Sequence, residues 1–426
     1  MKKLLQYLGN YKKESILGPL FKLLEASFEL IVPLVMAAII DTGVANADRP
    51  YIMKMSLVLF LLALIGLTCA ITAQYFAAKA AVGCATGLRH ALFEHIETLS
   101  FTEMDTVGTS TLITRMTSDV NQVQNGVNLV LRLFLRSPFI VFGAMVMAFT
   151  IDVKAALVFV VTIPLLSVVV FGIMLVSIPL YKKVQAALDK VLGITRENLT
   201  GSRVIRAFNK EQDEIAQFHE DNEALTKIQL YVGKISALMN PLTYIIINGA
   251  IVVLVWVGAI RVDNGNITQG QVVALVSYMS QILVELIKLA NLIININKSI
   301  ACMNRIETVL DMESSITEHP AAETGSLTSD GAGREGKETI PAENAVVFSR
   351  VGLTYAGASE EALSDIDFTV RRGETIGIIG GTGSGKSSVV NLIPRFYDAT
   401  RGEVLVDGKN VRDYTLEELR AKVGVV

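Results

Sequence analysis

The sequence has 426 residues, of which 51% are hydrophobic and 19% are charged, and its formal net charge is −3. A mean hydropathy of +0.47 is too apolar for an ordinary soluble domain, while the charged fraction is too high for a chain buried entirely in lipid. A membrane part joined to a soluble part fits these values, and the near-neutral balance gives no reason to expect a nucleic-acid partner.

The first residues, MKKLLQYLGNYKKE, are basic but lack a compact apolar core that ends in a small-residue cleavage site. They predict a basic amphipathic helix lying on the inner face of a membrane, instead of a signal peptide. The three cysteines are far apart and have no metal-ligand spacing, so we expect reduced, small hydrophobic side chains at Cys69, Cys84 and Cys302.

Six stretches are apolar over the roughly 20 residues that a helix needs to cross a bilayer. They lie at about 15–40, 54–80, 133–151, 155–180, 240–261 and 271–296. The connections after the second and fourth are long and basic, whereas the others carry few Lys or Arg. This bias predicts a multi-pass protein of the cell inner (cytoplasmic) membrane with both termini and both long connections in the cytoplasm. Arg132 and Arg136, near the inner end of the third span, are predicted to extend toward the inner surface.

The two long connections predict helices, because their apolar residues recur at helical spacing. Helices that continue about 25 residues beyond the bilayer would project roughly 38 Å at 1.5 Å per residue. The periodicity breaks at 104–111 and 198–204, where small residues and glycine indicate that each helix turns back. Two interpretations remain open: each hairpin presents its tip to another domain, or the hairpins form a bundle that packs only on itself.

Ionisable side chains inside the spans are costly and need a partner or a cavity. One hypothesis is a substrate cavity with an acidic lining that favours cationic, partly apolar compounds, formed by Glu25, Glu29, Asn248 and Glu285. The alternative, which the sequence spacing favours, is that Glu285 pairs with Lys288 and that Glu25 lies at the interface beside Lys22.

Residues 311–344 are polar, rich in Gly, Ser, Thr and Glu, and without periodicity, so they predict a flexible linker. The linker divides the chain into a six-helix, all-α transmembrane domain at 1–310 with long cytoplasmic helical extensions, and an α/β domain at 345–426. In the latter, strands are predicted at AVVFSRVGLTY, DIDFTV, TIGIIG, GEVLVDG and VGVV.

Two local signals in the α/β domain predict particular turns and caps. The pair Asp407-Gly408 suits a tight hairpin turn. Thr415 precedes a helix-like run, and Glu418 three residues later completes a capping box.

The segment GGTGSGKSS satisfies the pattern G-x-x-x-x-G-K-[ST] of a phosphate-binding loop. Glycines let backbone N–H groups wrap a phosphate, and the following helix adds its positive end. Lys386 would reach the β- and γ-phosphates, and the Ser387 hydroxyl would hold Mg²⁺. The alternative is a glycine-rich turn without a ligand. The predicted ATP-binding residues of the loop are Gly380, Gly381, Thr382, Gly383, Ser384, Gly385, Lys386, Ser387 and Ser388.

Several segments in this order resemble the exporters of the ATP-binding-cassette (ABC) superfamily, in the half-transporter form with fused membrane and nucleotide-binding domains. LSFTEMDTVGTSTLITRMTSDVNQVQN resembles the first intracellular hairpin of that family, and RENLTGSRVIRAFNKEQDEIAQF resembles the second. GETIGIIGGTGSGKSSVVNLIPRFYDATRGEVLVDG resembles its Walker A region. In the detail of its sequence, the chain most resembles bacterial multidrug exporters that work as heterodimers.

The resemblance implies an ATPase that uses ATP and Mg²⁺ to export hydrophobic or amphipathic compounds, such as drugs, by alternating access. Tyr355, at the end of the first strand, would stack on adenine, although it is also a plausible strand aromatic. The breaks at 104–111 and 198–204 would be coupling helices that touch nucleotide-binding domains, the second one on a partner subunit. The expected partners are a second half-transporter, more often in a heterodimer than in a homodimer, the bilayer and a small amphipathic substrate.

The sequence departs from the family at LRAKVGVV, where the glutamine loop, signature sequence, Walker B aspartate, catalytic glutamate and switch histidine would follow. We therefore expect a C-terminally truncated fragment of a functional transporter and assign no catalytic residue to this chain. The alternatives are a short, non-hydrolytic nucleotide-binding or regulatory membrane protein, and a lipid or peptide exporter of the same family. A P-loop kinase or GTPase on a membrane anchor would leave the six spans unexplained.

Overall fold

The computed structural model describes residues 2–316 and 343–425. The chain divides into two compact units. The first combines Met1–Ala85 with Gln122–Ala301, and the second combines Thr86–Asn121 with Cys302–Val426. The tip of the first long connection therefore groups with the soluble part of the chain. The predicted linker at 311–344 lies for the most part outside the described residues.

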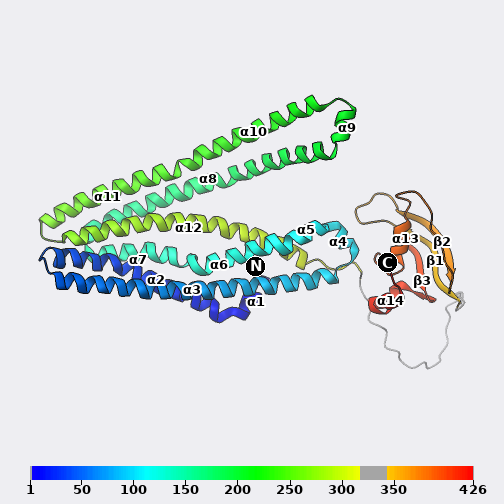
Figure 1. Ribbon diagram of the computed structural model, residues 1–426, viewed down its shortest axis with the longest axis horizontal. Coiled ribbons are helices and arrows are strands. Elements are labelled where there is room, and N and C mark those ends of the chain that lie inside the picture. The colour runs from blue at the N-terminus through cyan, green and yellow to red at the C-terminus, as the bar shows by residue number, and fades with distance from the viewer. Residues whose placement is uncertain (1, 317–342, 426) are drawn as a thin grey trace, which may run out of the picture. The chain divides into compact units, whose positions relative to one another are not determined.

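Helices make up the first unit (Figure 1). Among the described residues, six helical segments are long and apolar enough to cross a membrane, and each predicted span lies within one of them. The elements of this unit are α1 (Lys2–Leu8), the 3-10 turn η1 (Gly9–Tyr11), α2 (Lys12–Ala38), the π-helical η2 (Ile39–Val44), α3 (Arg49–Thr98), α6 (Val120–Leu129), the π-helical η4 (Val130–Phe134), α7 (Arg136–Ile151), α8 (Val153–Thr200), α9 (Ser202–Ala207), α10 (Glu211–Ala237), α11 (Met239–Asp263) and α12 (Gln269–Leu310). Helices α3, α6 and α12 continue into the second unit.

Small residues let the helices of the first unit pack closely, as is usual where lipid supplies no hydrophobic drive between helices. Ala144 on α7 is fully buried, and a Cβ added at Gly143 would lie 2.4 Å from a methyl group of Leu30. Tyr278 on α12 is also fully buried, and its hydroxyl donates to the carbonyl of Leu30 over 2.6 Å. Many large apolar side chains on the outer helix faces remain exposed, as lipid contact requires.

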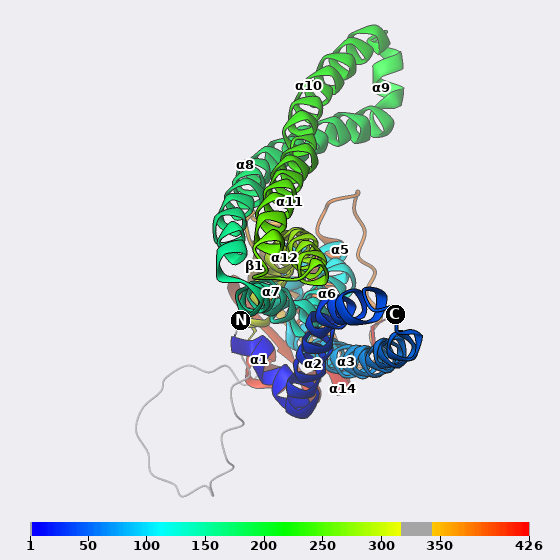
Figure 2. The ribbon, with the colours of Figure 1, turned by 90° about the vertical axis from the view of Figure 1, so that its left-hand side faces the viewer.

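The second long connection forms the predicted helical hairpin. Helix α8 ends at Thr200, Gly201 breaks it, and α9 and α10 carry the chain back, which confirms the break expected at 198–204. Lys190 and Asp221 pair across α8 and α10 over 2.5 Å. Figure 2 shows this hairpin leaving the other helices of the first unit.

The second unit joins a short helical tip to a small antiparallel sheet. Its strands lie in the order β2-β1-β3-β4, and Phe348 of β1 pairs with Phe368 of β2 and with Val404 of β3. These side chains and the helices behind them form the core of the lobe. The elements are α4 (Phe101–Val107), α5 (Thr109–Thr114), the π-helical η3 (Arg115–Asp119), β1 (Asn344–Leu353), β2 (Leu363–Arg371), α13 (Lys386–Leu392), β3 (Arg401–Val406), β4 (Lys409–Asn410), the 3-10 turn η5 (Val411–Asp413) and α14 (Leu416–Lys422).

The local signals of the lobe are confirmed. Asp407 and Gly408 have φ of 50° and 76°, and Val406 pairs with Lys409 across the hairpin turn between β3 and β4. Thr415 and Glu418 form the predicted capping box at the start of α14. The three cysteines are buried and free, as expected from their spacing.

Two strand predictions are wrong. TIGIIG at 375–380 and the described part of VGVV, residues 423–425, have no strand structure. A strand needs a neighbour for its backbone hydrogen bonds, and within the described residues the sheet contains only β1 to β4. Ile379 is 96% exposed, which shows that the apolar run has no packing surface here.

Candidate functional site

The glycine-rich loop leads directly into α13. Gly383 and Gly385 have φ of 85° and 83°, the left-handed region that favours glycine. At Gly385 the space is also closed, because a Cβ would lie 2.6 Å from Leu363 Cδ2. Backbone conformation and packing therefore both require glycine at the residue that precedes the lysine.

Lys386 folds back over this loop. Its Nζ donates to the carbonyls of Gly380 and Gly381 over 2.9 and 2.7 Å, and it lies 3.3 Å from Ser384 Oγ. Ser387 lies at the start of α13, while Thr382 is exposed in the loop. A flexible ammonium over a glycine loop fits a polyphosphate, and a hydroxyl beside it fits Mg²⁺. In the described part of the chain, no cluster of His, Cys, Asp or Glu forms a separate metal site.

Tyr355 lies just past the end of β1 and faces the loop helix. Its hydroxyl donates to Ser388 Oγ over 2.8 Å, so the buried Ser388 is bonded to the tyrosine. The Tyr355 ring meets Tyr397 edge-on, with ring centroids 5.1 Å apart. The structure thus brings Tyr355 beside the loop helix, and its stacking on adenine stays a prediction.

The short helix α4 packs on the soluble lobe within the second unit. The Phe101 ring lies 4.6 Å from the Phe396 ring, and the Tyr397 hydroxyl donates to Asp105 over 2.5 Å. Helix α4 thus ends in the first half of the predicted break, and Gly108, with φ of 82°, separates it from α5. The contact favours a hairpin tip that meets another domain over a bundle that packs only on itself.

Phe396 and Tyr397 are contact residues that the sequence did not reveal, because the motif RFYD contributed only to the family resemblance. Tyr397 lies with Thr102, Ser315 and Tyr355 on one side of the lobe. A pocket of about 210 Å³ lies there, lined by Thr102, Ser315, Ile316, Leu353, Thr354, Tyr355, Ala356, Tyr397 and Asp398.

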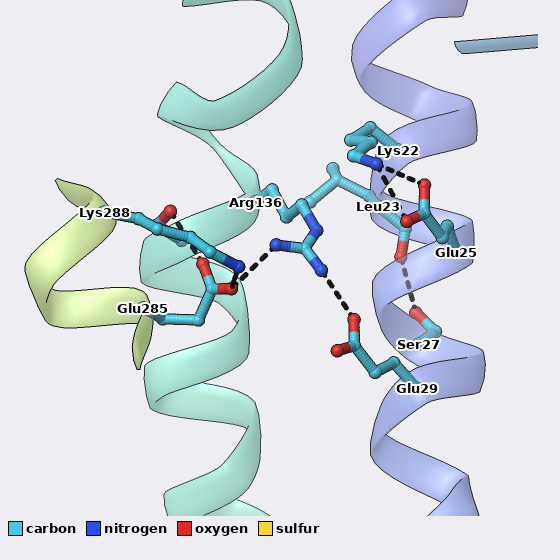
Figure 3. A network of polar contacts seen from close by, with 9 residues as sticks. Lys22, Leu23, Glu25, Ser27, Glu29, Arg136, Glu285 and Lys288 are labelled. Atoms are coloured by element: carbon cyan, nitrogen blue, oxygen red, sulfur yellow. Dashed lines mark hydrogen bonds and ion pairs between the residues drawn. The ribbon is translucent and has the colours of Figure 1, made fainter. Parts of the chain in front are cut away.

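Four charged residues of the membrane unit form a connected network of ion pairs: Glu29, Arg136, Glu285 and Lys288 (Figure 3). The Arg136 guanidinium donates to Glu285 Oε1 over 2.7 Å and to Glu29 Oε2 over 2.6 Å. Lys288 lies 2.9 Å from the same Glu285 oxygen, which confirms the predicted pairing of these two residues. The expectation that Arg136 extends to the inner surface is wrong: it is 8% exposed, because two carboxylates hold it between α2 and α12.

The second predicted pair, Lys22 with Glu25, is also present, at 2.5 Å. Glu25, Glu29 and Arg136 line a pocket of about 400 Å³ between α2 and α3. Its other lining residues are apolar: Phe28, Val32, Leu62, Ala63, Gly66, Leu67 and Ala70.

Two residues of the predicted acidic lining lie elsewhere. Glu285 is 2% exposed and is covered by its partners Arg136 and Lys288. Asn248 lies on an exposed position of α11. The three carboxylates of the hypothesis are each paired with a cationic side chain, so they do not form an unpaired acidic surface.

Comparison with known families decides the identity of the chain. Residues 15–286 match the family described as the ABC transporter transmembrane region, and residues 363–426 match the family described as ABC transporter. The chain belongs to the ABC transporter family. It is a subunit of the exporter type, in which membrane and ATP-binding regions are fused.

Several curated relatives of this ABC exporter subunit have the same arrangement. An ABC transporter ATP-binding protein of Mycobacterium tuberculosis, itself uncharacterised, is 33% identical over 423 residues, which is 99% of this chain and 70% of the relative. A Bacillus subtilis protein named as a putative multidrug export ATP-binding/permease protein is 30% identical over 436 residues, covering 100% of this chain and 72% of its own length. An ATP-dependent lipid A-core flippase of Desulfotalea psychrophila is 30% identical over 79% of this chain and 56% of the flippase.

Membership of the family implies ATP binding, normally with Mg²⁺, and ATPase activity of the intact protein. The six apolar helices and the exporter relatives indicate a multi-pass protein of the cell membrane. Half-transporters of this family generally dimerise in the bilayer.

One further feature of the ABC exporter subunit was not visible in the sequence. Asp119 at the end of η3 is 3% exposed and accepts from Arg305 over 2.5 and 3.0 Å. Arg115 binds the same carboxylate over 2.8 Å. This ion-pair cluster ties the return helix of the first hairpin to the last turns of α12, two segments separated by 186 positions in the sequence.

Proposed function

We propose that the chain is one half of an ATP-driven exporter that moves hydrophobic or amphipathic compounds, including drugs, outward across the cytoplasmic membrane. The observation that carries the proposal is the arrangement within the second unit, where the Lys386 loop, Tyr355 and α4 are in one connected structure. The proposed nucleotide site and the end of a membrane hairpin are therefore parts of the same compact unit.

At the nucleotide site, Lys386 and the backbone N–H groups of 380–388 bind the phosphates, and Tyr355 stacks on adenine. Ser387 provides the hydroxyl for Mg²⁺. We assign nucleotide binding, and no catalytic step, to these residues. ATP held between two such lobes closes them and turns the membrane cavity outward, and hydrolysis resets the cycle.

The proposed partner is a second half-transporter, in a heterodimer. The tip of the α8–α10 hairpin supports a contact with another subunit, because it carries exposed apolar side chains at Val204 and Phe208, which are 61% and 73% exposed. Apolar side chains at the end of a long polar hairpin are typical of a docking surface. In this topology both chain termini lie in the cytoplasm.

For the substrate, the pocket between α2 and α3 supports an amphipathic compound. Its walls are mostly apolar, while Glu25, Glu29 and Arg136 supply both signs of charge. Because both carboxylates are paired with cationic side chains, the pocket does not demand a cation, and cationic, zwitterionic and neutral amphiphiles all remain within the proposed range. A lipid exporter of the same family is the second candidate, and one relative is named as a lipid A-core flippase.

The variant Lys386→Ala tests the proposal in the intact transporter. Loss of the ammonium over the loop should abolish ATP-dependent transport and weaken binding of a fluorescent ATP analogue, while membrane insertion is unchanged because no span is touched. Dye efflux and nucleotide titration of protein in lipid vesicles measure the two effects.

Lys409→Ala is the matched control, since Lys409 lies on β4 and contacts only the Tyr414 ring among the interactions described for it. It should retain transport. Normal ATP-dependent transport by Lys386→Ala would contradict the proposed function. Efflux by Glu25→Gln and Glu285→Gln, compared for cationic and neutral dyes, tests whether acidic groups select the substrate.

A further inference from the structure

Four residues of the second unit form a continuous chain of contacts from α4 to the glycine-rich loop. Asp105 of α4 accepts from the Tyr397 hydroxyl over 2.5 Å. The Tyr397 ring meets Tyr355 edge-on at 5.1 Å, and the Tyr355 hydroxyl donates to Ser388 over 2.8 Å. Ser388 belongs to the loop helix that begins with Lys386.

We infer that Tyr397 is a positioning residue that links the conformation of α4 to the orientation of Tyr355, and hence to nucleotide affinity. The inference rests on the proposed function, because it takes Tyr355 and the Lys386 loop to be the ATP site. It goes beyond that function by naming the side chain through which the position of the membrane hairpin and the conformation of the nucleotide site affect each other.

The backbone on either side of Tyr397 is fixed by an ion pair between Arg395 and Asp398. Arg395 is 4% exposed and has a φ of 54°, a left-handed conformation that costs free energy unless its surroundings fix it. Its guanidinium binds both oxygens of Asp398, over 2.8 and 3.1 Å. The tyrosine between these two residues therefore has a defined direction and can transmit a displacement.

On the other side, α4 is held against the lobe at two points. Phe101 lies 4.6 Å from Phe396, and Asp105 one turn later binds Tyr397. Burial and the neighbouring Asp105 raise the pKa of Tyr397, so the phenol stays protonated and remains the donor in this hydrogen bond. Two contacts a turn apart define both the position and the tilt of α4.

The consequence is a reciprocal coupling. If α4 moves, the Tyr397 ring moves with Asp105, and the edge-on contact that orients Tyr355 changes. By linkage, a nucleotide that prefers one orientation of Tyr355 must favour the corresponding position of α4. Tyr397 touches neither phosphate nor a reacting atom in this scheme.

The experiment separates the ring of Tyr397 from its hydroxyl. Tyr397→Ala removes both, and should weaken binding of a fluorescent ATP analogue about three- to ten-fold, the range expected for one edge-on aromatic contact. Tyr397→Phe keeps the ring and should bind the analogue within about two-fold of wild type, since only the bond to Asp105 is lost. Asp105→Ala, which removes the same bond from the α4 side, should behave like Tyr397→Phe.

The second readout is hydrogen exchange in α4, measured on the full chain in lipid with and without the ATP analogue. Wild-type protein should show slower exchange of the α4 amides when nucleotide is bound. Tyr397→Phe and Asp105→Ala should bind nucleotide but lose this response. Their double variant should be no worse than either single variant, because the two changes remove the same contact.

Tyr414→Phe is the matched control, since it also removes a tyrosine hydroxyl, which donates to Val406 over 2.9 Å away from α4. It should retain both nucleotide binding and the α4 response. An unchanged α4 response in Tyr397→Phe, or additive effects in the double variant, would overturn the inference while leaving ATP binding intact. Failure of wild-type protein to bind the analogue, or equal binding by Lys386→Ala, would overturn the proposed function and the inference with it.

Discussion

Arg136 of α7 and Glu285 of α12 form an ion pair of 2.7 Å in which both side chains are almost fully buried, 8% and 2% exposed. Ser137 donates to the second Glu285 oxygen over 2.9 Å, and Glu29 on α2 takes the other end of the guanidinium. Three helices are thereby joined at one arginine. Because lipid provides no alternative partner for these charges, the pair specifies how the helices meet.

Arg136→Ala should strongly destabilise the membrane unit. Removing Arg136 leaves the buried Glu285 with the partly exposed Lys288 as its remaining cationic partner, and loss of one member of a buried ion pair costs about 3–5 kcal/mol. The thermal unfolding of detergent-purified protein should therefore move to clearly lower temperature. The double variant Arg136→Met with Glu285→Gln should recover much of this loss, since it removes both charges.

Lys288→Ala serves as the comparison for that experiment. Lys288 contacts the same Glu285 oxygen over 2.9 Å, but its side chain is 46% exposed, so its loss should cost no more than about 1 kcal/mol. If Lys288→Ala were as destabilising as Arg136→Ala, the buried arginine would not be the member that joins the three helices.

The membrane charges illustrate what the sequence can and cannot predict. Glu285 and Lys288 lie one turn apart on one helix, and Lys22 and Glu25 do the same, so helical spacing alone was enough to predict both pairs. Arg136 pairs with residues 107 and 149 positions away, and no local pattern encodes that choice. Because Arg136 lies at the end of a span, the sequence predicted that its guanidinium would reach water. In the folded protein it pairs with two carboxylates from neighbouring helices instead.

Arg305→Met should loosen the junction between η3 and α12. Asp119 would keep Arg115 but lose the two hydrogen bonds from Arg305, and a buried carboxylate that loses hydrogen bonds costs about 1–3 kcal/mol. We expect faster hydrogen exchange at 115–119 and a lower unfolding temperature. Asn304→Ala, the exposed neighbour on α12, should leave both measurements within error of wild type, and a matching loss there would mean that the ion pair is not responsible.

Gly385→Ala should abolish the nucleotide-binding conformation of the loop. A left-handed φ of 83° costs a residue with a Cβ about 1–2 kcal/mol, and the new methyl group would also lie 2.6 Å from Leu363 Cδ2. Affinity for a fluorescent ATP analogue should fall by at least about tenfold, equivalent to about 1.4 kcal/mol. Gly383→Ala separates the two causes: its φ is 85°, but a Cβ added there would meet no atom within 4 Å, so it should show only the part of the affinity loss that backbone strain causes.

The glycine-rich loop could be predicted from the sequence because all of its residues are consecutive in the chain. Nine consecutive residues define both the backbone path and the position of Lys386. The contact of α4 with Tyr397 could not be predicted from the sequence, since Asp105 and Tyr397 are 292 positions apart and neither belongs to a local pattern that indicates a partner. The strand expected at TIGIIG failed for a related reason: its residues have strand propensity, but a strand also requires a paired neighbour.

The stability of the lobe should depend on pH through Asp407 and Lys422, whose side chains pair over 2.8 Å. The hydrogen bond from Lys422, with the nearby Arg372, holds the pKa of Asp407 below its usual range. A carboxyl whose pKa is lower in the folded state adds stability above its unfolded pKa of about 4, and this contribution disappears as the pH falls through the folded value. Bonding to Asp407 raises the pKa of Lys422, so its contribution is present below about pH 10 and is lost as the pH rises through the raised value.

Asp407→Asn, which tolerates the φ of 50° at this turn, should therefore unfold more easily than wild type near neutral pH. The difference should shrink as the pH falls below the unfolded pKa of about 4 and should close as the pH passes through the lowered pKa of Asp407 in the folded protein, and urea unfolding followed across pH measures it. Asp365→Asn, at a similar φ of 52°, controls for the exchange of aspartate for asparagine in a left-handed backbone conformation. A gap between wild type and Asp407→Asn that persists in acid would exclude the ion pair as its cause, because protonation of Asp407 removes the same charge that the substitution removes.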